Sequence, residues 1–298
     1  METLPLDIFL YIIDLLAGER DKGIKSLQIL SHTCKFMVPL CRKHLFSTLN
    51  LHSKLISKHF SDLFSTNPDI ARYVKRLSYI VSNSISDHEL NILDMLKEHS
   101  SLQWIELSSG WESLDWNNLT ESMRLSLVFL MQMPTVIFLS INSFKGFPAT
   151  ALSGCSNLIE LHLGDLNLAP PEINQVISRN KIPTPVMLFI KTKTYGLAAV
   201  LNSATLQASD QIVDFSRLQG AQFYVESRND LVQANELIKG TTRLVYLNIV
   251  GEWIDVVTYR DLIDDIFKGI TLWSWQDWAQ ASRLAPTRRS NYWNSELL

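Results

Sequence analysis

The side chains that most often carry out chemistry in proteins are present, but they fall into no catalytic or metal-binding spacing. The seven histidines form neither H-x-x-x-H nor H-E-x-x-H, and none stands beside a cysteine pair with zinc spacing. Cys34 and Cys41 lie in a helical region, where small core residues are favoured over metal ligands. The sequence therefore predicts neither a metal nor another cofactor.

Motifs for phosphate binding and for nucleophilic catalysis are also missing from the sequence. No G-x-x-x-x-G-K-[ST] loop, no G-x-G-x-x-G and no G-x-S-x-G is found. Asp264 and Asp265 follow Asp261 in a helical pattern, which favours a solvated helix face over a pair of catalytic carboxylates. We therefore expect that the protein is not an enzyme, and a hydrolase with an unrecognised site is the remaining alternative.

Three tryptophans and a basic pair are the other candidate binding residues. Trp104, Trp111 and Trp116 lie near one predicted strand, where they could line a binding surface, although core or edge packing is favoured. Arg288-Arg289 is too short to be a nucleic-acid footprint.

Composition and charge narrow the class of protein. The chain has 298 residues, 46% hydrophobic and 19% charged, which is typical of a globular protein. Its 27 basic and 30 acidic residues give a net charge of −3, so neither nucleic acid nor membrane is expected as a partner. The three cysteines form no disulfide framework. Since no secretory signal and no membrane span is visible, we expect a cytoplasmic and/or nuclear protein.

Three short helices are predicted in residues 1–50. The stretch Leu4-Pro5-Leu6-Asp7 suits a helix start, and Ile8, Ile12 and Leu16 then follow on one face. Leu10 adds to an apolar surface that is wider than one core contact requires. A helix of this kind exposes leucine and isoleucine unless something covers them, so we expect a covering partner.

A short strand pattern recurs from Val74 onward: apolar, two residues, apolar, one residue, apolar. The clear copies begin at Val74, Leu102, Val136, Leu158 and Leu244, and weaker ones lie near 186–190 and 218–225. The central positions Leu77, Ile105, Leu139 and Leu161 are separated by 28, 34 and 22 residues. Leucine-rich repeats run at about 20–29 residues, so two of the three gaps fit. We expect these residues, and Leu247, to face inward from parallel strands.

Helical patterns fill the gaps between the predicted strands. Helix starts are expected at Ser86, at Asn118 or Thr120, at Pro171 and at Asn229. Alternating strands and helices suit a stack of βα units, each of which buries its apolar face on the next. An ordinary α/β domain with a parallel sheet is the alternative. The pattern does not continue after residue 268.

The sequence resembles fungal F-box proteins with irregular leucine-rich repeats. The F-box likeness is carried by Leu4-Pro5, Ile8, Ile12 and Leu16, by Leu27-x-x-Leu30-Ser31 and Phe36, and by His44-Leu45-Phe46. The repeat likeness is carried by residues 60–77 and 122–168. The resemblance implies an α/β protein with four parts. These are a three-helix F-box (1–50), a helical linker (51–73), an irregular leucine-rich-repeat solenoid of parallel βα units (74–268) and a divergent C-terminal segment (269–298).

The resemblance also implies a function. In that family the F-box docks on the Skp-type adaptor of a cullin-based ubiquitin ligase, and the repeats hold a target protein. Adaptor-facing or adjoining core positions are then implied for Leu4, Pro5, Ile8, Ile12, Leu16, Leu27, Leu30 and Ser31. We therefore expect a substrate-recognition adaptor in protein ubiquitination. The alternatives are a three-helix cap on the repeats and a repeat scaffold for protein–protein interaction with no ubiquitin role.

Overall fold

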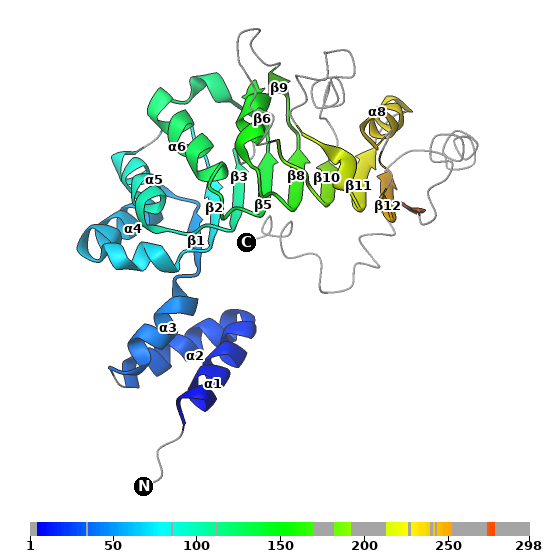
Figure 1. Ribbon diagram of the computed structural model, residues 1–298. Coiled ribbons are helices and arrows are strands. Elements are labelled where there is room, and N and C mark those ends of the chain that lie inside the picture. The colour runs from blue at the N-terminus through cyan, green and yellow to red at the C-terminus, as the bar shows by residue number, and fades with distance from the viewer. Residues whose placement is uncertain are drawn as a thin grey trace. The chain divides into compact units, whose positions relative to one another are not determined.

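The computed structural model shows a mixed α/β protein whose strands pair in parallel (Figure 1). It describes residues 5–33, 35–84, 86–110, 113–169, 182–191, 213–225, 228–238, 241, 243–251 and 273–277. The chain divides into two compact units. The N-terminal unit contains residues 1–110 and 117–137, and the C-terminal unit contains residues 111–116 and 138–298.

The N-terminal unit begins with three helices and continues with alternating strands and helices. The first three helices are α1 (Leu6–Gly18), α2 (Arg20–Thr33) and α3 (Met37–Leu45). The next elements are β1 (Thr48–Leu51), α4 (Lys54–Thr66), the 3-10 helix η1 (Pro68–Tyr73), β2 (Arg76–Ile80), α5 (Asp87–His99), β3 (Trp104–Ser108) and α6 (Glu121–Met131). The predicted helical linker at 51–73 therefore contains α4 and η1.

The strands of the N-terminal unit are ordered β1-β2-β3 and place one row of apolar residues in the core. Leu49 pairs with Leu77, and Leu77 pairs with Ile105. All three are at most 1% exposed. Because side chains alternate along a strand, the intervening residues point to the other face of the sheet. The predicted inward orientation of Leu77 and Ile105 on parallel strands is confirmed.

Helix α5 begins at the predicted cap. The Ser86 hydroxyl accepts a hydrogen bond from the Glu89 backbone N–H at 3.4 Å, and the Glu89 carboxylate accepts one from the Ser86 backbone N–H at 2.8 Å. This reciprocal pair is a capping box, which satisfies two backbone donors that the first turn of a helix leaves unpaired. Thr120 caps α6 in a simpler way, by accepting from the Met123 N–H at 3.3 Å.

We expect Ser86→Ala to lower the free energy of unfolding by about 1 kcal/mol, because alanine cannot accept the Glu89 N–H. Urea unfolding followed by circular dichroism measures the change. Ser122→Ala, at an exposed position in the first turn of α6, is the matched control and should stay within about 0.5 kcal/mol of wild type. Equal effects of the two substitutions would show that the capping box contributes nothing to stability.

The C-terminal unit continues the parallel arrangement. Its longer strands are β5 (Phe138–Asn142), β8 (Glu160–Gly164), β10 (Met187–Lys191), β11 (Gly220–Val225), β12 (Tyr246–Gly251) and β13 (Trp273–Asp277), neighbours in that order. Its described helices are the 3-10 helices η3 (Ala149–Gly154) and η5 (Phe215–Arg217) and the helix α8 (Arg228–Ile238). The helix expected at Pro171 lies outside the described residues.

One fully buried row runs through the strands of the C-terminal unit. Leu139, Leu161, Leu188, Ala221 and Leu247 follow one another in register, and each is 0% exposed. The inward orientation predicted for Leu139, Leu161 and Leu247 is therefore confirmed. Close packing of this row accounts for much of the core of the unit.

Two pairs of short strands, separate from the longer strands above, carry part of an aromatic cluster. They are β4 (Leu114–Asp115) with β6 (Phe144–Lys145), and β7 (Phe147–Pro148) with β9 (Leu168–Ala169). Trp116, in the 3-10 helix η2 (Trp116–Asn118), packs edge-on against Phe147 at 4.7 Å and Phe144 at 5.8 Å between ring centroids. Trp116 is 3% exposed, so it belongs to the core rather than to a binding surface.

Two strands lie outside the range in which strands were expected. β1 lies before Val74, in residues that were expected to be helical, although Phe46, Leu49 and Leu51 have the same apolar spacing as the later strands. β13 follows residue 268, where the pattern was expected not to continue, yet it pairs in parallel with β12. In register, Trp273 pairs with Leu247 and Trp275 pairs with Ile249.

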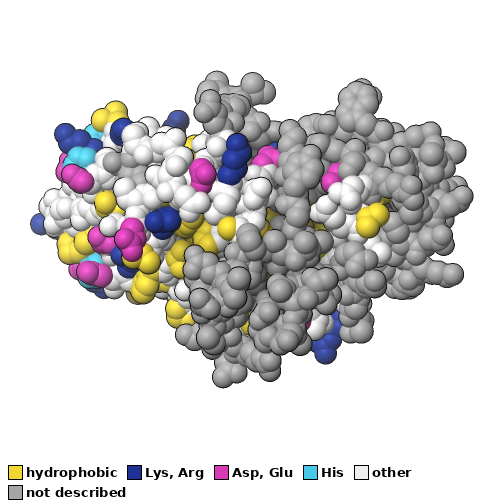
Figure 2. Space-filling view, turned by 90° about the horizontal axis from the view of Figure 1, so that it is seen from above, with side chains coloured by type: hydrophobic (Ala, Val, Ile, Leu, Met, Phe, Trp, Pro, Cys, Tyr) yellow, Lys and Arg dark blue, Asp and Glu magenta, His cyan; other side chains and the backbone are white. Residues whose placement is uncertain are grey.

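Charged side chains of both signs lie among hydrophobic ones on the face that Figure 2 shows. This mixture is consistent with the net charge of −3. A partner of the described residues on this face would therefore have to be recognised by local contacts rather than by a broad field of one sign.

Candidate functional site

The three N-terminal helices share a very small core. Its buried members are Ile13, Leu27, Met37 and Cys41. Phe9, Leu16, Ala17, Leu30, Leu40 and Leu45 pack against them and stay partly exposed. Four buried side chains are few for an independently stable unit, so the helices need neighbouring structure or a partner to hold them.

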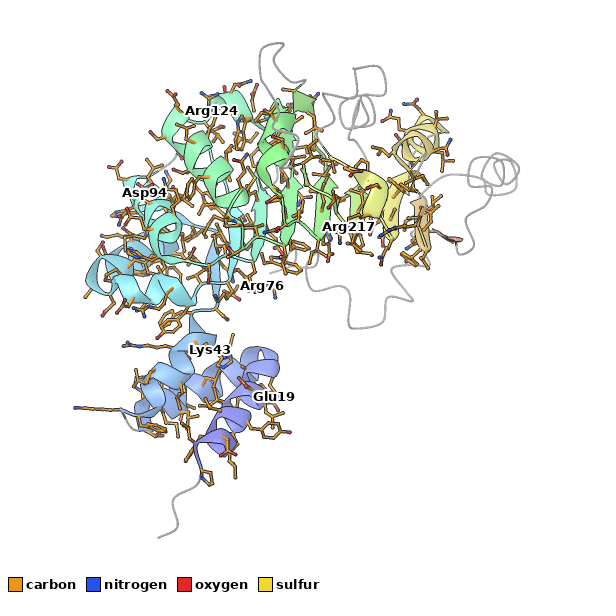
Figure 3. All side chains as sticks on the ribbon, viewed as in Figure 1. Glu19, Lys43, Arg76, Asp94, Arg124 and Arg217 are labelled. Carbon is orange, nitrogen blue, oxygen red and sulfur yellow. The ribbon has the colours of Figure 1, made fainter. Side chains whose placement is uncertain are left out.

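Local chemistry explains the close pairing of α1 and α2. Pro5 precedes α1, and Asp7 lies in its first turn, where a carboxylate complements the positive end of the helix dipole. Figure 3 places Glu19 at the turn between the two helices and Lys43 on α3. Gly23 permits the crossing, because a Cβ at this position would collide with the Leu16 carbonyl oxygen.

Helix α1 exposes apolar side chains over most of its circumference. Ile13 is its only buried residue among those described. The exposed set, here called the α1 surface, consists of Leu6, Ile8, Leu10, Tyr11, Ile12 and Leu15, each between 40% and 64% exposed. A helix that is apolar all round is normally buried. The α1 surface is therefore the strongest candidate binding surface among the described residues.

Aromatic and ionic contacts extend this surface and tie it to α3. Phe36 is 51% exposed and packs edge-on against Phe9 of α1, with ring centroids 6.3 Å apart. The Nε2 atom of His44 lies 3.0 Å from Oδ1 of Asp14. Asp14 is largely exposed, so this contact contributes little to stability.

The structure separates the eight residues that the resemblance singled out. Ile8 and Ile12 belong to the α1 surface, and Pro5 is exposed just before it. Leu27 is 1% exposed and cannot touch a partner directly. Leu16 and Leu30 are half-buried against the core. The Ser31 hydroxyl donates a hydrogen bond to the Gln28 carbonyl at 2.6 Å. Leu4 lies outside the described residues.

Three members of the α1 surface were not among the predicted binding residues. Leu6, Tyr11 and Leu15 fall between the positions that the F-box likeness specifies, whereas Leu10 was expected to widen the apolar surface. The signal that could have found them was the near absence of polar residues in α1, where Asp7 and Asp14 are the only charged side chains.

Two buried side chains elsewhere in the described residues have raised pKa values. Burial raises the pKa of the Cys155 thiol to about 12 and, with the nearby Glu89 carboxylate, raises the pKa of the Tyr79 phenol. A thiol with so high a pKa is a poor nucleophile near neutral pH. In the described parts of the chain, no three His, Cys, Asp or Glu side chains gather as metal ligands. No described helix is both long and apolar enough to cross a membrane.

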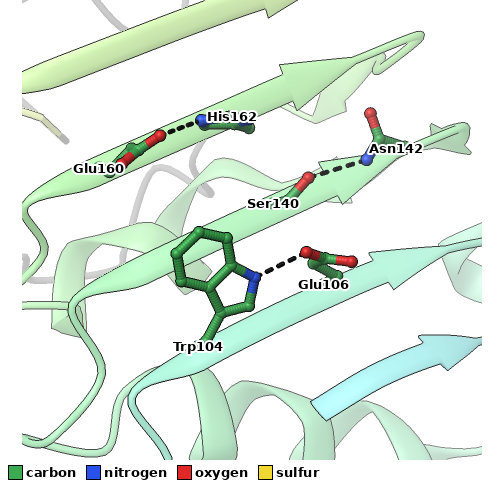
Figure 4. Close-up of polar contacts among 6 residues, drawn as sticks. All are labelled: Trp104, Glu106, Ser140, Asn142, Glu160 and His162. Atoms are coloured by element: carbon green, nitrogen blue, oxygen red, sulfur yellow. Dashed lines mark hydrogen bonds and ion pairs between the residues drawn. The ribbon is translucent and has the colours of Figure 1, made fainter. Parts of the chain in front are cut away.

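On the face of the strands opposite the buried rows, side-chain rings contact carboxylates (Figure 4). In the N-terminal unit, Nε1 of Trp104 donates to Oε1 of Glu106 at 2.6 Å, and the Arg76 guanidinium stacks 4.3 Å from the Trp104 ring. In the C-terminal unit, Nε2 of His162 lies 2.6 Å from Oε1 of Glu160. Trp111, Asp264, Asp265 and Arg288-Arg289 lie outside the described residues.

A scan against protein-family models found no match to the chain, and a search of curated proteins found none either.

Proposed function

We propose that the chain is a substrate-recognition adaptor of a cullin-based ubiquitin ligase. The α1 surface would bind a Skp-type adaptor, and the parallel strand–helix units would hold a target protein. The α1 surface carries this proposal, because six exposed apolar residues on one helix need a covering partner. The likeness of the first fifty residues to the F-box motif identifies the partner class.

The energetics favour a partner that also contacts residues near α1. Covering a half-exposed aliphatic side chain contributes about 1 kcal/mol, roughly half the value for full burial. The five aliphatic residues and Tyr11 of the α1 surface together contribute about 6 kcal/mol, whereas association costs about 4–15 kcal/mol. The α1 surface alone is therefore marginal. Phe36 and Ile24, 51% and 48% exposed on the same three-helix segment, are the expected additional contacts.

The strand–helix units supply the second binding function. Their buried rows, Leu49-Leu77-Ile105 in one unit and Leu139 to Leu247 in the other, support a repeat architecture in which successive strands line one face. The mechanism is proximity, since holding a target beside the charged transferase raises its effective concentration. None of this chain's residues needs to perform a chemical step.

Direct binding to a purified Skp-type adaptor tests the proposed function. We expect the full chain and the adaptor to co-elute in size-exclusion chromatography as a one-to-one complex, and the complex to bind cullin. A folded chain that elutes alone at micromolar concentrations would exclude the ubiquitin role. A repeat scaffold with a three-helix cap would then be the better description.

A further inference from the structure

Glu160 and His162 lie on the face of the C-terminal unit that points away from Leu161. In register, Glu160 is flanked by Phe138 and Met187, and His162 is flanked by Ser140 and Phe189. The immediate neighbours on both adjacent strands are therefore uncharged. The nearest charged register position on β10 is Lys191, which pairs with Gly164 rather than with Glu160 or His162.

The His162 ring is fixed from three sides. Its centroid lies 4.7 Å from that of Phe138 and 4.2 Å from that of Phe189. Because a carboxylate can only accept, Nε2 donates the hydrogen bond to Oε1 of Glu160 at 2.6 Å. This hydrogen bond ties the Glu160 carboxylate to the His162 ring, which in turn lies against the ring of Phe189.

The Glu160 carboxylate keeps binding capacity for a ligand. Its side chain is 32% exposed, against 16% for His162. Oε1 accepts from His162, and no described contact occupies Oε2. A carboxylate oxygen beside aromatic ring faces attracts cations, through a charge-assisted hydrogen bond and through the ring quadrupole.

In the N-terminal unit, a cation contacts the ring of a similar pair. Trp104 and Glu106 are also two residues apart on one strand and joined by a ring N–H donor at 2.6 Å. There the chain's own Arg76 places its guanidinium on the ring. At Glu160 and His162, the flanking positions of β5 and β10 hold Phe138, Ser140, Met187 and Phe189, so the chain supplies no arginine from them.

We propose that Glu160, His162 and Phe189 form a subsite for an arginine side chain on the target protein. A planar guanidinium can stack on a ring while it donates to a carboxylate, which a lysine ammonium does less well. The subsite rests on the proposed function in one respect, namely that the arginine belongs to the target protein. Binding of the arginine itself does not depend on a ubiquitin ligase.

Titration of the full chain with a short peptide tests the subsite. The probe is acetyl-Ser-Gly-Arg-Gly-Ser-amide, and the neutral control carries citrulline, which keeps the shape of arginine without its charge. The imidazole resonances of His162, assigned by their loss in His162→Gln, report binding. We expect saturable shifts with the arginine peptide and at least about tenfold weaker binding of the citrulline and lysine peptides.

Variants separate recognition from folding. Glu160→Gln keeps an acceptor for His162 but loses the charge, so it should weaken arginine binding at least about tenfold. Glu121→Gln, at an exposed position on α6, is the matched control and should change nothing. Phe189→Leu should also weaken binding. Each variant should keep the melting temperature of the wild type, which shows that it remains folded.

Three outcomes would overturn the subsite: no saturable shift, equal binding of the citrulline or lysine peptide, or full binding by Glu160→Gln. Glu160→Gln should still capture the Skp-type adaptor, because the α1 surface lies in the other unit. Arginine binding without adaptor capture would therefore reject the proposed ubiquitin role and keep the subsite.

Discussion

The double substitution Ile8→Lys and Ile12→Lys is expected to abolish capture of a Skp-type adaptor and to leave the chain folded. The two residues lie one turn apart on α1 and are 41% and 40% exposed. In the free chain the lysines can extend into water. In a complex each would be an unpaired charge in an apolar contact, which costs several kcal/mol. The dissociation constant should therefore rise at least about a hundredfold, as measured by calorimetry.

A matched pair on another helix provides the control. Leu125 and Phe129 have the same four-residue spacing on α6, are 63% and 54% exposed and belong to the same unit. Leu125→Lys with Phe129→Lys should leave adaptor capture at wild-type strength. Leu16→Lys is unsuitable, because Leu16 packs against the small helical core and its loss would confuse unfolding with lost binding.

Wild-type capture by the α1 variant, or equal loss in both variants, would reject the α1 surface as the adaptor site. Loss of the folded N-terminal unit in the α1 variant alone would favour a structural cap. Circular dichroism and the melting temperature distinguish these cases.

The parallel arrangement could be predicted because its signal is local and repeated. Leu77, Ile105, Leu139 and Leu161 each occupy the same place in a six-residue pattern, and each becomes buried in register with its neighbours. The α5 start could be predicted for a similar reason, since a capping box depends only on residues three positions apart. Strand β1 has the same spacing at Phe46, Leu49 and Leu51, but these residues fall in the segments 1–50 and 51–73 that were expected to be helical.

The candidate site could be predicted only in outline. Periodicity shows that α1 is apolar, but a helix with apolar residues on every side does not reveal which of them meets the core. Ile13 is buried whereas Ile12, its direct neighbour, is 40% exposed. That choice depends on where α2 and α3 pack, which is a tertiary property. The ring contacts of His162 likewise depend on three strands that are distant in the sequence.

Trp116→Ala is expected to destabilise the C-terminal unit by about 3–5 kcal/mol, the range for removing a large aromatic side chain from a core. Trp116 is 3% exposed and packs against Phe144 and Phe147, which are both 0% exposed. Alanine would leave a cavity beside two rings that the short strands β6 and β7 hold in place. Trp116→Phe keeps a ring there and should cost about half as much or less. Urea unfolding followed by circular dichroism gives both values.

Adaptor capture should persist under native conditions, because the three N-terminal helices belong to the other unit. A loss below about 1 kcal/mol for Trp116→Ala would mean that the cluster adds little to the core and that the tryptophan is better explained as a contact for a partner.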